Sequence, residues 1–269
     1  MHDIETPLSF EDIAGTILDS YHTKSDALGP SKISTYLQCP RQYQYKYIDR
    51  IPAPSSPAAA LGSTFHAIVS KARAEHWTPD CAGQAAEALT ELWDIVRPET
   101  SDPDDPNAAA AFLDARDKWL AWYLEWSEPQ DDIWVEQFFD LEVMGIELQG
   151  TVDRVYTQDG RTVISDVKTG KRTPSDSDLG TDLQLSLYSY AYRLLTESTE
   201  DALEICHVRT QKTPQTHRTD KYLEAVIADV VVPVAVAIEQ GIFPCNPATK
   251  FGCGYCDYQQ GCPVGRGVE

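Results

Sequence analysis

The sequence predicts an α/β fold in which a β-sheet is flanked by helices. Two observations favour this class. Strand-like segments follow one another from Ile133 to Lys168, and a further strand over 203–210 comes after a helix over 181–197. Helical patterns fill most of the chain before Ile133, and a last helix is expected over 220–241. The chain is therefore expected to form a helical part, a sheet-forming core and a C-terminal tail.

The helical part can be divided by its prolines. Residues 1–30 mix polar and apolar positions and are predicted to form a loosely packed lead-in. A helix over 31–47 should break into two pieces at Pro40, because proline cannot continue a helix but suits its first turn. A proline-rich connector follows over 51–60. Three more helices are expected over 61–77, with Ser63 or Thr64 as N-cap, over 81–97 and over 108–126.

The most informative stretch is a hairpin centred on Asp-Gly at 159–160. This dipeptide between two alternating segments is the strongest short-range signal for a two-residue β-turn. With these residues in the turn, Asp153 lies opposite Asp166, and Lys168 points to the same face because side chains alternate along a strand. Two like charges opposite each other are normally destabilising. The hairpin therefore predicts a divalent cation held between the two carboxylates.

Composition limits the class of protein. The chain has 269 residues, enough for one large domain or two small ones, and a formal net charge of −20. Such a field repels phosphates, so most acidic residues are expected on a solvated surface, although a local basic groove can coexist with it. No segment approaches the roughly 20 apolar residues of a membrane helix, and the acidic N-terminus lacks the features of a signal peptide. A cytoplasmic protein without membrane contact is expected.

The seven cysteines indicate metal binding or reactivity before disulfides. Cys253, Cys256 and Cys262 crowd a glycine-rich tail. A tetrahedral metal or an iron–sulfur cluster needs four ligands. The fourth could be Cys245, which is nearby, or Cys39, at the predicted helix junction. Spacing alone does not choose between these two, nor between zinc and iron–sulfur.

The segment 31–50 carries tyrosines at helical spacing, interleaved with basic residues. Two interpretations are open. The tyrosines can cover the core from an amphipathic helix, or the segment can form a basic, aromatic strip that meets a nucleic-acid strand. The candidates for nucleic-acid contact are Lys32, Tyr36, Arg41 and Lys46.

Six motifs occur in order along almost the whole chain. They are Ser34-x4-Cys39-Pro40, Gly62-Ser63-x2-His66, Gly150-x2-Asp153-Arg154, Asp166-x-Lys168-Thr169-Gly170, Gln184-x3-Tyr188 and the triplet Cys253, Cys256 and Cys262. Together they resemble the PD-(D/E)XK nuclease superfamily, in its RecB-like branch with an iron–sulfur cluster, which includes AddB-type and CRISPR-associated adaptation nucleases. One departure is Asp166, where many relatives carry glutamate.

The resemblance implies a restriction-endonuclease-like core, a mixed β-sheet flanked by helices. After the lead-in 1–30, a single iron–sulfur nuclease domain is expected over 31–269. Its parts are a mainly helical segment 31–130, a nuclease core 131–241 and a cysteine-rich tail 242–269. The resemblance also implies a [4Fe–4S] cluster that joins the N- and C-terminal segments, with Cys245 left as a spare thiol. The implied ligands are Cys39, Cys253, Cys256 and Cys262.

The implied metal site would hold Mg²⁺ or Mn²⁺. Hard cations prefer oxygen ligands, which Asp153, Asp166 and the Val167 carbonyl would provide. His66 would add a nitrogen ligand, which favours Mn²⁺ somewhat. Glu136, on the preceding strand, is a further acidic residue that could approach the metal.

The implied activity is that of a metal-dependent DNA nuclease, most consistent with an exonuclease on single-stranded or frayed ends. A bound metal lowers the pKa of its water and stabilises charge on the phosphorus oxygens. Lys168 would position the attacking water and offset charge in the transition state. Gln184 and Tyr188 would orient Lys168 or a phosphate.

Two other functions stay open at this stage. One is a catalytically idle protein that grips DNA ends within a recombination, repair or CRISPR adaptation complex. The other is a zinc-stabilised structural protein whose carboxylate pair is incidental. The chain has no G-x4-G-K-[ST] loop, so any ATP-driven unwinding would come from a partner such as a helicase.

Overall fold

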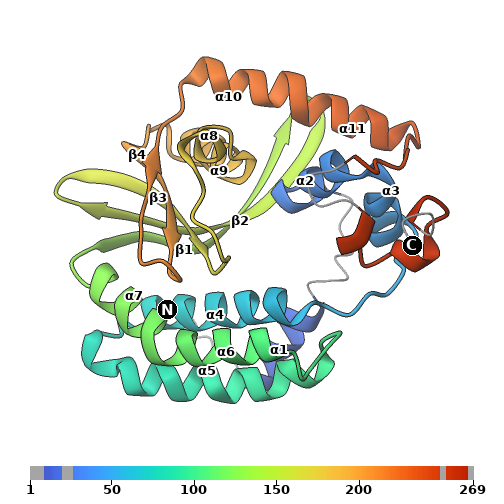
Figure 1. The fold of residues 1–269 in the computed structure, drawn as a ribbon. Helices are drawn as coiled ribbons and strands as arrows, with labels where there is room; N and C mark the ends of the chain where they lie inside the picture. Colours follow the sequence, from blue (N-terminus) through green and yellow to red (C-terminus); the bar gives the residue numbers. More distant parts are fainter. Residues whose placement is uncertain (1–8, 20–26, 249–252, 266–269) are drawn as a thin grey trace.

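A computed structural model describes residues 9–19, 27–248 and 253–265 (Figure 1). The helices are α1 (Phe10–Asp19), α2 (Pro30–Gln38), α3 (Pro40–Tyr43), α4 (Pro57–Ala74), α5 (Ala82–Val96), α6 (Pro106–Asp114), α7 (Leu120–Ser127), α8 (Asp176–Gly180), α9 (Leu183–Thr196), α10 (Asp220–Val226) and α11 (Val232–Glu239). The strands are β1 (Asp131–Val143), β2 (Ile146–Gln158), β3 (Arg161–Lys168), β4 (Ala202–His207) and β5 (Gln215–Thr216). Short π-helical segments continue α3 to Ile48, join α6 to α7 and join α10 to α11.

The strands form one mixed sheet in the order β1-β2-β3-β4-β5. β1, β2 and β3 pair antiparallel, β3 and β4 pair parallel, and β5 closes the edge antiparallel. The parallel step is made by α8 and α9, which carry the chain from β3 back to β4. The expected mixed sheet flanked by helices is confirmed, and it is consistent with a restriction-endonuclease-like fold.

The predicted hairpin has the predicted turn and register. Asp159 and Gly160 both have positive φ, at 53° and 74°, as a type I′ turn requires. Arg154 pairs with Ser165 and Val155 with Ile164, which are the partners expected from an Asp-Gly turn at these two positions.

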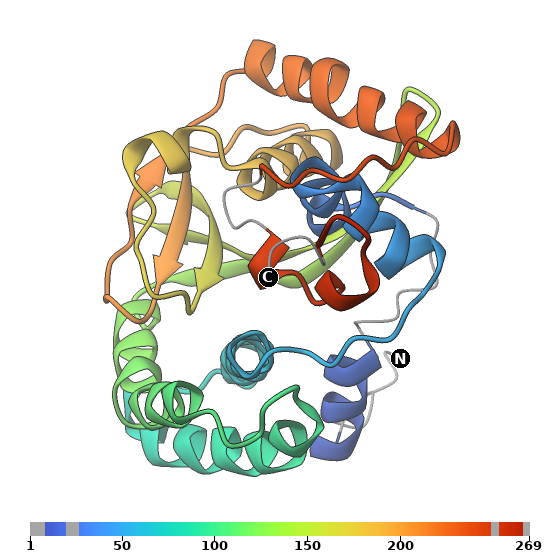
Figure 2. The same cartoon turned by 45° about the vertical axis from the view of Figure 1, so that its right-hand side comes forward.

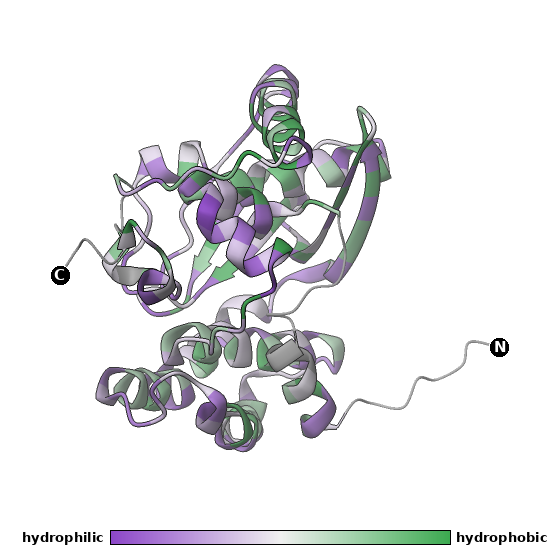
Figure 3. Cartoon of the chain, turned by 90° about the vertical axis from the view of Figure 1, so that its right-hand side faces the viewer, coloured by the Kyte–Doolittle hydropathy of each residue, from purple (hydrophilic) through white to green (hydrophobic). Residues whose placement is uncertain are grey.

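Each face of the sheet is covered by its own hydrophobic core. Helices α4 to α7, together with α1, form a layer below the sheet, and this core includes Phe65 and Val167 (Figures 1 and 2). Helices α2, α9, α10 and α11 cover the other face, where Val155 and Ile164 are fully buried. Figure 3 shows hydrophobic segments on the strands and on the helices packed against them. The sheet therefore separates two packed layers.

The C-terminal segment returns to the N-terminal helices. It lies beside α2 and α3 in Figures 1 and 2. The Arg41 amide donates to the Pro244 carbonyl (3.2 Å), the Tyr36 hydroxyl to the Ile242 carbonyl (2.7 Å) and the Tyr258 hydroxyl to the Ile51 carbonyl (3.2 Å). These bonds join segments about 200 residues apart in sequence.

Two boundaries differ from the sequence expectation. Within residues 1–30, predicted as a loosely packed lead-in, α1 packs Ala14, with 1% of its surface exposed, into the lower core. Helix α4 begins at Pro57, where we expected the connector to continue. Its N-cap is Ser56, whose hydroxyl accepts from the Ala59 amide (3.3 Å), and not Ser63 or Thr64. Proline at the first helical position extends the helix one turn upstream.

Within the described residues, no helix is both long enough and apolar enough to cross a membrane.

Close packing of β1 against β2 leaves no room for a side chain at Gly150. Gly150 pairs with Phe139, and a Cβ atom added to it would lie 2.6 Å from Cζ of the buried Phe139 ring. We expect Gly150→Ala to destabilise the protein by about 2 kcal/mol in urea unfolding, as overpacking does. Gly83→Ala is the matched control, because its added methyl meets no atom within 4 Å. Equal stability of the two variants would contradict this account.

Candidate active site and cysteine pocket

Asp153 and Asp166 project from adjacent strands onto the face covered by α9. The ladder between β2 and β3 ends at Arg154 and Ser165, one residue short of the two aspartates. There the Val167 amide donates instead to Asp153 Oδ2 (3.0 Å). The side chain of Asp166 is fully buried, while that of Asp153 is 11% exposed.

A continuous chain of polar contacts links the two aspartates through Lys168. Lys168 Nζ lies 2.7 Å from Asp166 Oδ2 and donates to Gln184 Oε1 (2.9 Å). Gln184 Nε2 donates to the Tyr188 hydroxyl (2.6 Å), which donates to Asp153 Oδ1 (3.2 Å). Gln184 and Tyr188 lie one turn apart on α9, so one helix face orients both Lys168 and Asp153.

Burial and the neighbouring charges shift the pKa values of Lys168 and Tyr188. Burial disfavours the charged form of Lys168, but Asp166 and Asp153 outweigh it and raise the lysine pKa. Burial and the two carboxylates raise the pKa of Tyr188 well above its usual value, so its hydroxyl keeps the proton that it donates. Lys168 is 39% exposed at its side chain and can still reach a ligand.

His66 reaches the same group from α4, on the opposite side of the sheet edge. Its Nε2 lies 2.7 Å from the Val167 carbonyl oxygen, and its Nδ1 lies 3.3 Å from Asp153 Oδ2. The ring thus contacts two of the atoms expected to hold a metal. The structure brings His66, Asp153, Asp166, Val167, Lys168, Gln184 and Tyr188 into one site.

The donor set fits a hard divalent cation. Within the described residues, both carboxylate oxygens of Asp166 are buried without a hydrogen-bond partner, and the ion pair with Lys168 offsets their charge. Burial raises the pKa of Asp166 well above its ordinary value; Lys168 opposes this, and Asp153 adds to it. In the part of the chain that the structure describes, no three His, Cys, Asp or Glu side chains are already arranged around one metal ion. A cation would draw the two aspartates and the Val167 carbonyl together.

Glu136 lies on β1, opposite Asp153 on β2. Val135 pairs with Arg154 and Gln137 with Val152, which places Glu136 opposite Asp153. Its φ of 47° is unusual for a strand residue and directs the side chain toward Ser70, whose Oγ is 2.6 Å from Glu136 Oε1. Partial burial and the charge of Asp153 raise the pKa of Glu136 to about 7.

Two cavities flank the site. The larger, about 1070 Å³, lies between α4 and the sheet and is lined by His66, Glu136, Asp166 and Lys168. The smaller, about 520 Å³, is lined by Asp153 and Tyr188. Ser31 and Gln184 line both, so the site lies where the two cavities meet.

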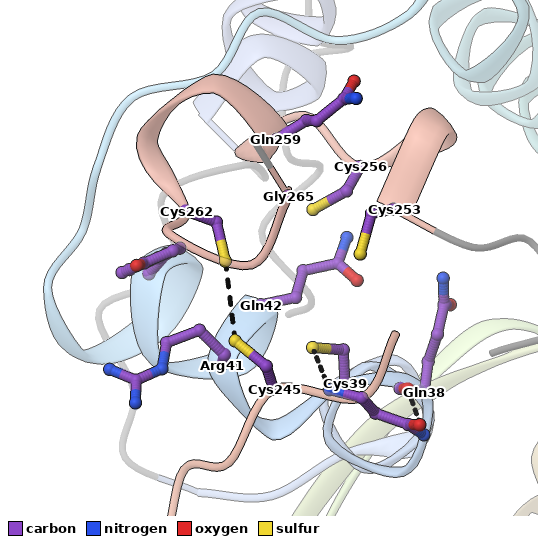
Figure 4. A pocket seen from close by; sticks show the side chains of 12 residues that line it. Gln38, Cys39, Arg41, Gln42, Cys245, Cys253, Cys256, Gln259, Cys262 and Gly265 are labelled. Atoms are coloured by element: carbon purple, nitrogen blue, oxygen red, sulfur yellow. Dashed lines mark hydrogen bonds between the residues drawn. The ribbon is translucent and has the colours of Figure 1, made fainter. Parts of the chain in front are cut away.

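The cysteines divide into two groups. Five line one small pocket between α2, α3 and the C-terminal segment, and Figure 4 shows their sulfur atoms directed into it; they are Cys39, Cys245, Cys253, Cys256 and Cys262. Cys81 lies in a separate turn, and Cys206 is buried in β4. Both residues considered for the fourth ligand, Cys245 and Cys39, therefore reach the pocket.

Cys245 and Cys262 are in direct contact, with their sulfur atoms 3.5 Å apart (Figure 4). Burial tends to raise the pKa of Cys262. Its pKa is nevertheless lowered below the usual value, by hydrogen bonds from the Gly265 amide, the Cys245 thiol and the Val264 amide and by the charge of Arg41. Burial and Cys262 raise the pKa of Cys245 to about 11. The pocket therefore favours a thiolate on Cys262, the form in which cysteine ligates metals.

The four residues predicted to contact nucleic acid lie in different surroundings. Tyr36 is buried with its hydroxyl bonded, and Lys32 is buried with its Nζ donating to the Ala27 carbonyl (2.7 Å). Arg41 lines the cysteine pocket. Lys46 lines the smaller cavity beside the site. Core packing, the first of the two interpretations of this segment, describes Tyr36. Of the four residues, Lys46 is the one that is both partly exposed and close to the aspartates, as the nucleic-acid interpretation requires.

Sequence reasoning missed Ser70 and Phe138. Ser70 follows His66 by one helical turn, a spacing that was available as a signal. Phe138 precedes Phe139 in one strand, and because strand side chains alternate, only one of the two can face the core. Phe139 is 2% exposed and Phe138 55%.

The sequence profile of the PD-(D/E)XK nuclease superfamily matches residues 27–263. The chain belongs to this superfamily. The matched range contains the site residues named above and the five cysteines of the pocket.

Two curated relatives come from bacteriophages. The Gene 69 protein of Mycobacterium phage D29 is 25% identical over 268 residues, covering 87% of this chain and 95% of that protein. The Gene 69 protein of Mycobacterium phage L5 is 24% identical over 283 residues with the same coverage. Among solved structures, the crystal structure of SSO0001 aligns over 96% of this chain and 97% of its own, at 12% identity and a TM-score of 0.39.

Asp166→Asn is predicted to stabilise the metal-free protein. Because the folded-state pKa of Asp166 is raised, folding favours the protonated carboxyl, and stability is lost as the pH rises from about 4, its unfolded value. In the variant, the ammonium group of Lys168 still has Gln184 as a hydrogen-bond acceptor and Asp153 as a nearby negative charge. We expect the variant to gain roughly 1 kcal/mol over wild type in EDTA at pH 8, with a smaller gain at pH 5.

Thermal unfolding in EDTA, repeated with added Mg²⁺ or Mn²⁺, checks this expectation. The ion should raise the Tm of wild type and leave that of Asp166→Asn unchanged. Asp140→Asn, at an exposed position of β1, is the control and should follow wild type in both conditions. A wild type that is more stable than Asp166→Asn at pH 8 without metal would contradict the role assigned to the buried carboxylate.

Proposed function

We propose that this protein is a metal-dependent DNA nuclease, an exonuclease that acts on single-stranded or frayed ends. The observation that carries the proposal is the buried Asp166 carboxylate, opposite Asp153 and linked to it through Lys168, Gln184 and Tyr188. A structural ion pair does not need two carboxylates, an exposed ammonium group and a helix that orients both. Membership of the superfamily supports the same chemistry.

Each residue has a role in the proposed reaction. Asp153, Asp166, the Val167 carbonyl and His66 would hold Mg²⁺ or Mn²⁺, which supplies charge stabilisation and an acidified water when bound. Lys168, fixed by Gln184, directs its ammonium group toward the cavity, where it can hold a water or a phosphate oxygen. Tyr188 fixes the rotamer of Asp153 through its hydroxyl.

We also propose that the cysteine pocket holds a [4Fe–4S] cluster, with Cys39, Cys253, Cys256 and Cys262 as ligands and Cys245 as a spare thiol. Support comes from the convergence of these sulfur atoms from two ends of the chain. Such a centre would reinforce the hydrogen bonds that join the C-terminal segment to α2 and α3. It would thereby fix the start of α2, which lines the smaller cavity.

The chain has no G-x4-G-K-[ST] loop for ATP, so we propose that a helicase or another recombination or adaptation protein delivers the DNA end. The overall charge of −20 supports delivery by a partner, because it disfavours unassisted binding to duplex DNA.

Loss of cleavage is the direct test. We expect wild type with Mg²⁺ or Mn²⁺ to degrade labelled single-stranded DNA, and Asp166→Ala and Lys168→Ala each to lose at least about a hundredfold in rate. Asp140→Ala and Lys221→Ala are controls of the same charge change at exposed positions outside the site. If the wild type binds DNA ends but does not cut them, the idle DNA-binding function replaces this one. If Asp166→Ala cuts as fast as wild type, the assigned site is wrong.

The colour of the anaerobically purified protein tests the cluster. We expect a brown protein that absorbs at about 400 nm, with iron and sulfide in equal amounts. Cys39→Ser should lose the absorbance, whereas Cys245→Ser and the control Cys81→Ser should keep it. A colourless protein with one bound zinc would support a zinc site instead, and loss of colour in Cys245→Ser would exclude its role as a spare.

A further inference from the structure

The smaller cavity extends from the active site toward β1 and the end of α3. Asp153, Gln184 and Tyr188 line it at its catalytic side. Phe138, from β1, and Lys46 and Tyr47, from the π-helical end of α3, line it elsewhere. At about 520 Å³ it can hold a nucleotide-sized group.

Phe138 and Asp153 line the same cavity. Phe138 pairs with Thr151, and Asp153 is two residues further along β2. The separation along the strand is about 7 Å. A single exposed aromatic residue needs no explanation by itself. Phe138 is 55% exposed and lines a cavity that Asp153 also lines, so its ring is available to stack on a base next to the scissile bond.

The charge at this cavity differs from that of the chain as a whole. Lys32 and Lys46 both approach the Tyr47 ring, with their Nζ atoms 5.6 and 5.3 Å from its centroid. Lys32 is already bonded to a backbone carbonyl, whereas among the described residues Lys46 has no hydrogen-bonding or ionic partner beyond this ring contact. In a protein of net charge −20, an aromatic ring and a lysine together beside two catalytic aspartates suit a base and its phosphate.

We propose that this cavity is a binding subsite for single-stranded nucleic acid, in which the unpaired base next to the scissile phosphate stacks on Phe138 and Lys46 contacts the backbone. The inference rests on the proposed nuclease function and adds the feature that would select the substrate. A base in a duplex is already stacked and paired, so it cannot use the Phe138 ring without being unpaired first. The subsite thus gives single strands and frayed ends an advantage over intact duplex.

Binding of a 12-nucleotide DNA strand carrying 2-aminopurine tests the subsite. Asp166→Asn serves as the background so that the strand stays intact, and affinity and 2-aminopurine quenching are measured at several salt concentrations. We expect Phe138→Ala to weaken binding about tenfold and to abolish the quenching, without changing the dependence on salt. Phe138→Trp should restore both. Lys46→Ala should instead lower the slope of log affinity against log salt by about 0.7 and leave the quenching in place.

Two matched controls complete the design. Met144→Ala removes a 73% exposed side chain at the tip of the same β-hairpin, and Lys221→Ala removes an exposed lysine on α10. Both should bind within twofold of the background protein. If Phe138→Ala binds and quenches like Met144→Ala, the subsite is overturned while nuclease activity of wild type still stands. If the background protein binds no strand at all, the proposed function falls together with the subsite.

Discussion

The structure depends on the way one buried negative charge is accommodated. Asp166 lies near the end of β3 with no exposed surface, and Lys168 offsets its charge, while a second carboxylate, Asp153, lies on the neighbouring strand. A fold would avoid this arrangement if stability alone mattered, because a buried carboxylate costs free energy that a single ion pair does not return. The surrounding residues limit that cost, and each of them also has a place in the proposed reaction.

The site is assembled from elements that are individually well packed. Val155 and Ile164, fully buried next to the aspartates, hold β2 and β3 in register up to the point where the ladder ends. There the Val167 amide turns from backbone pairing to Asp153, so the loss of a ladder bond is offset by a bond to a charged acceptor. The geometry of the carboxylates therefore follows from sheet register rather than from a flexible loop.

Local sequence rules predicted the parts of the site that short-range chemistry determines. The Asp-Gly turn sets the register of the hairpin, and register alone brings Asp153 and Asp166 to one face. Gln184 and Tyr188 followed from helical spacing. Contacts between distant segments could not be predicted from local patterns, because they depend on tertiary structure. Examples are the packing of α1 against α5, the hydrogen bond from Tyr36 to the Ile242 carbonyl and the position of Cys245 in the pocket. The start of α4 was missed for a different reason, since Ser56-Pro57 is a good helix start that the surrounding prolines obscured.

The division of the molecule into two cores has a mechanical consequence. His66 is carried by α4 and belongs to the lower layer, whereas Lys168, Gln184 and Tyr188 are held by the layer above the sheet. A small sliding of one layer over the other would withdraw the imidazole from the Val167 carbonyl and leave the lysine network intact. The proposed metal site therefore takes its residues from both layers, so the packing of α4 against the sheet sets the position of His66 relative to Asp153.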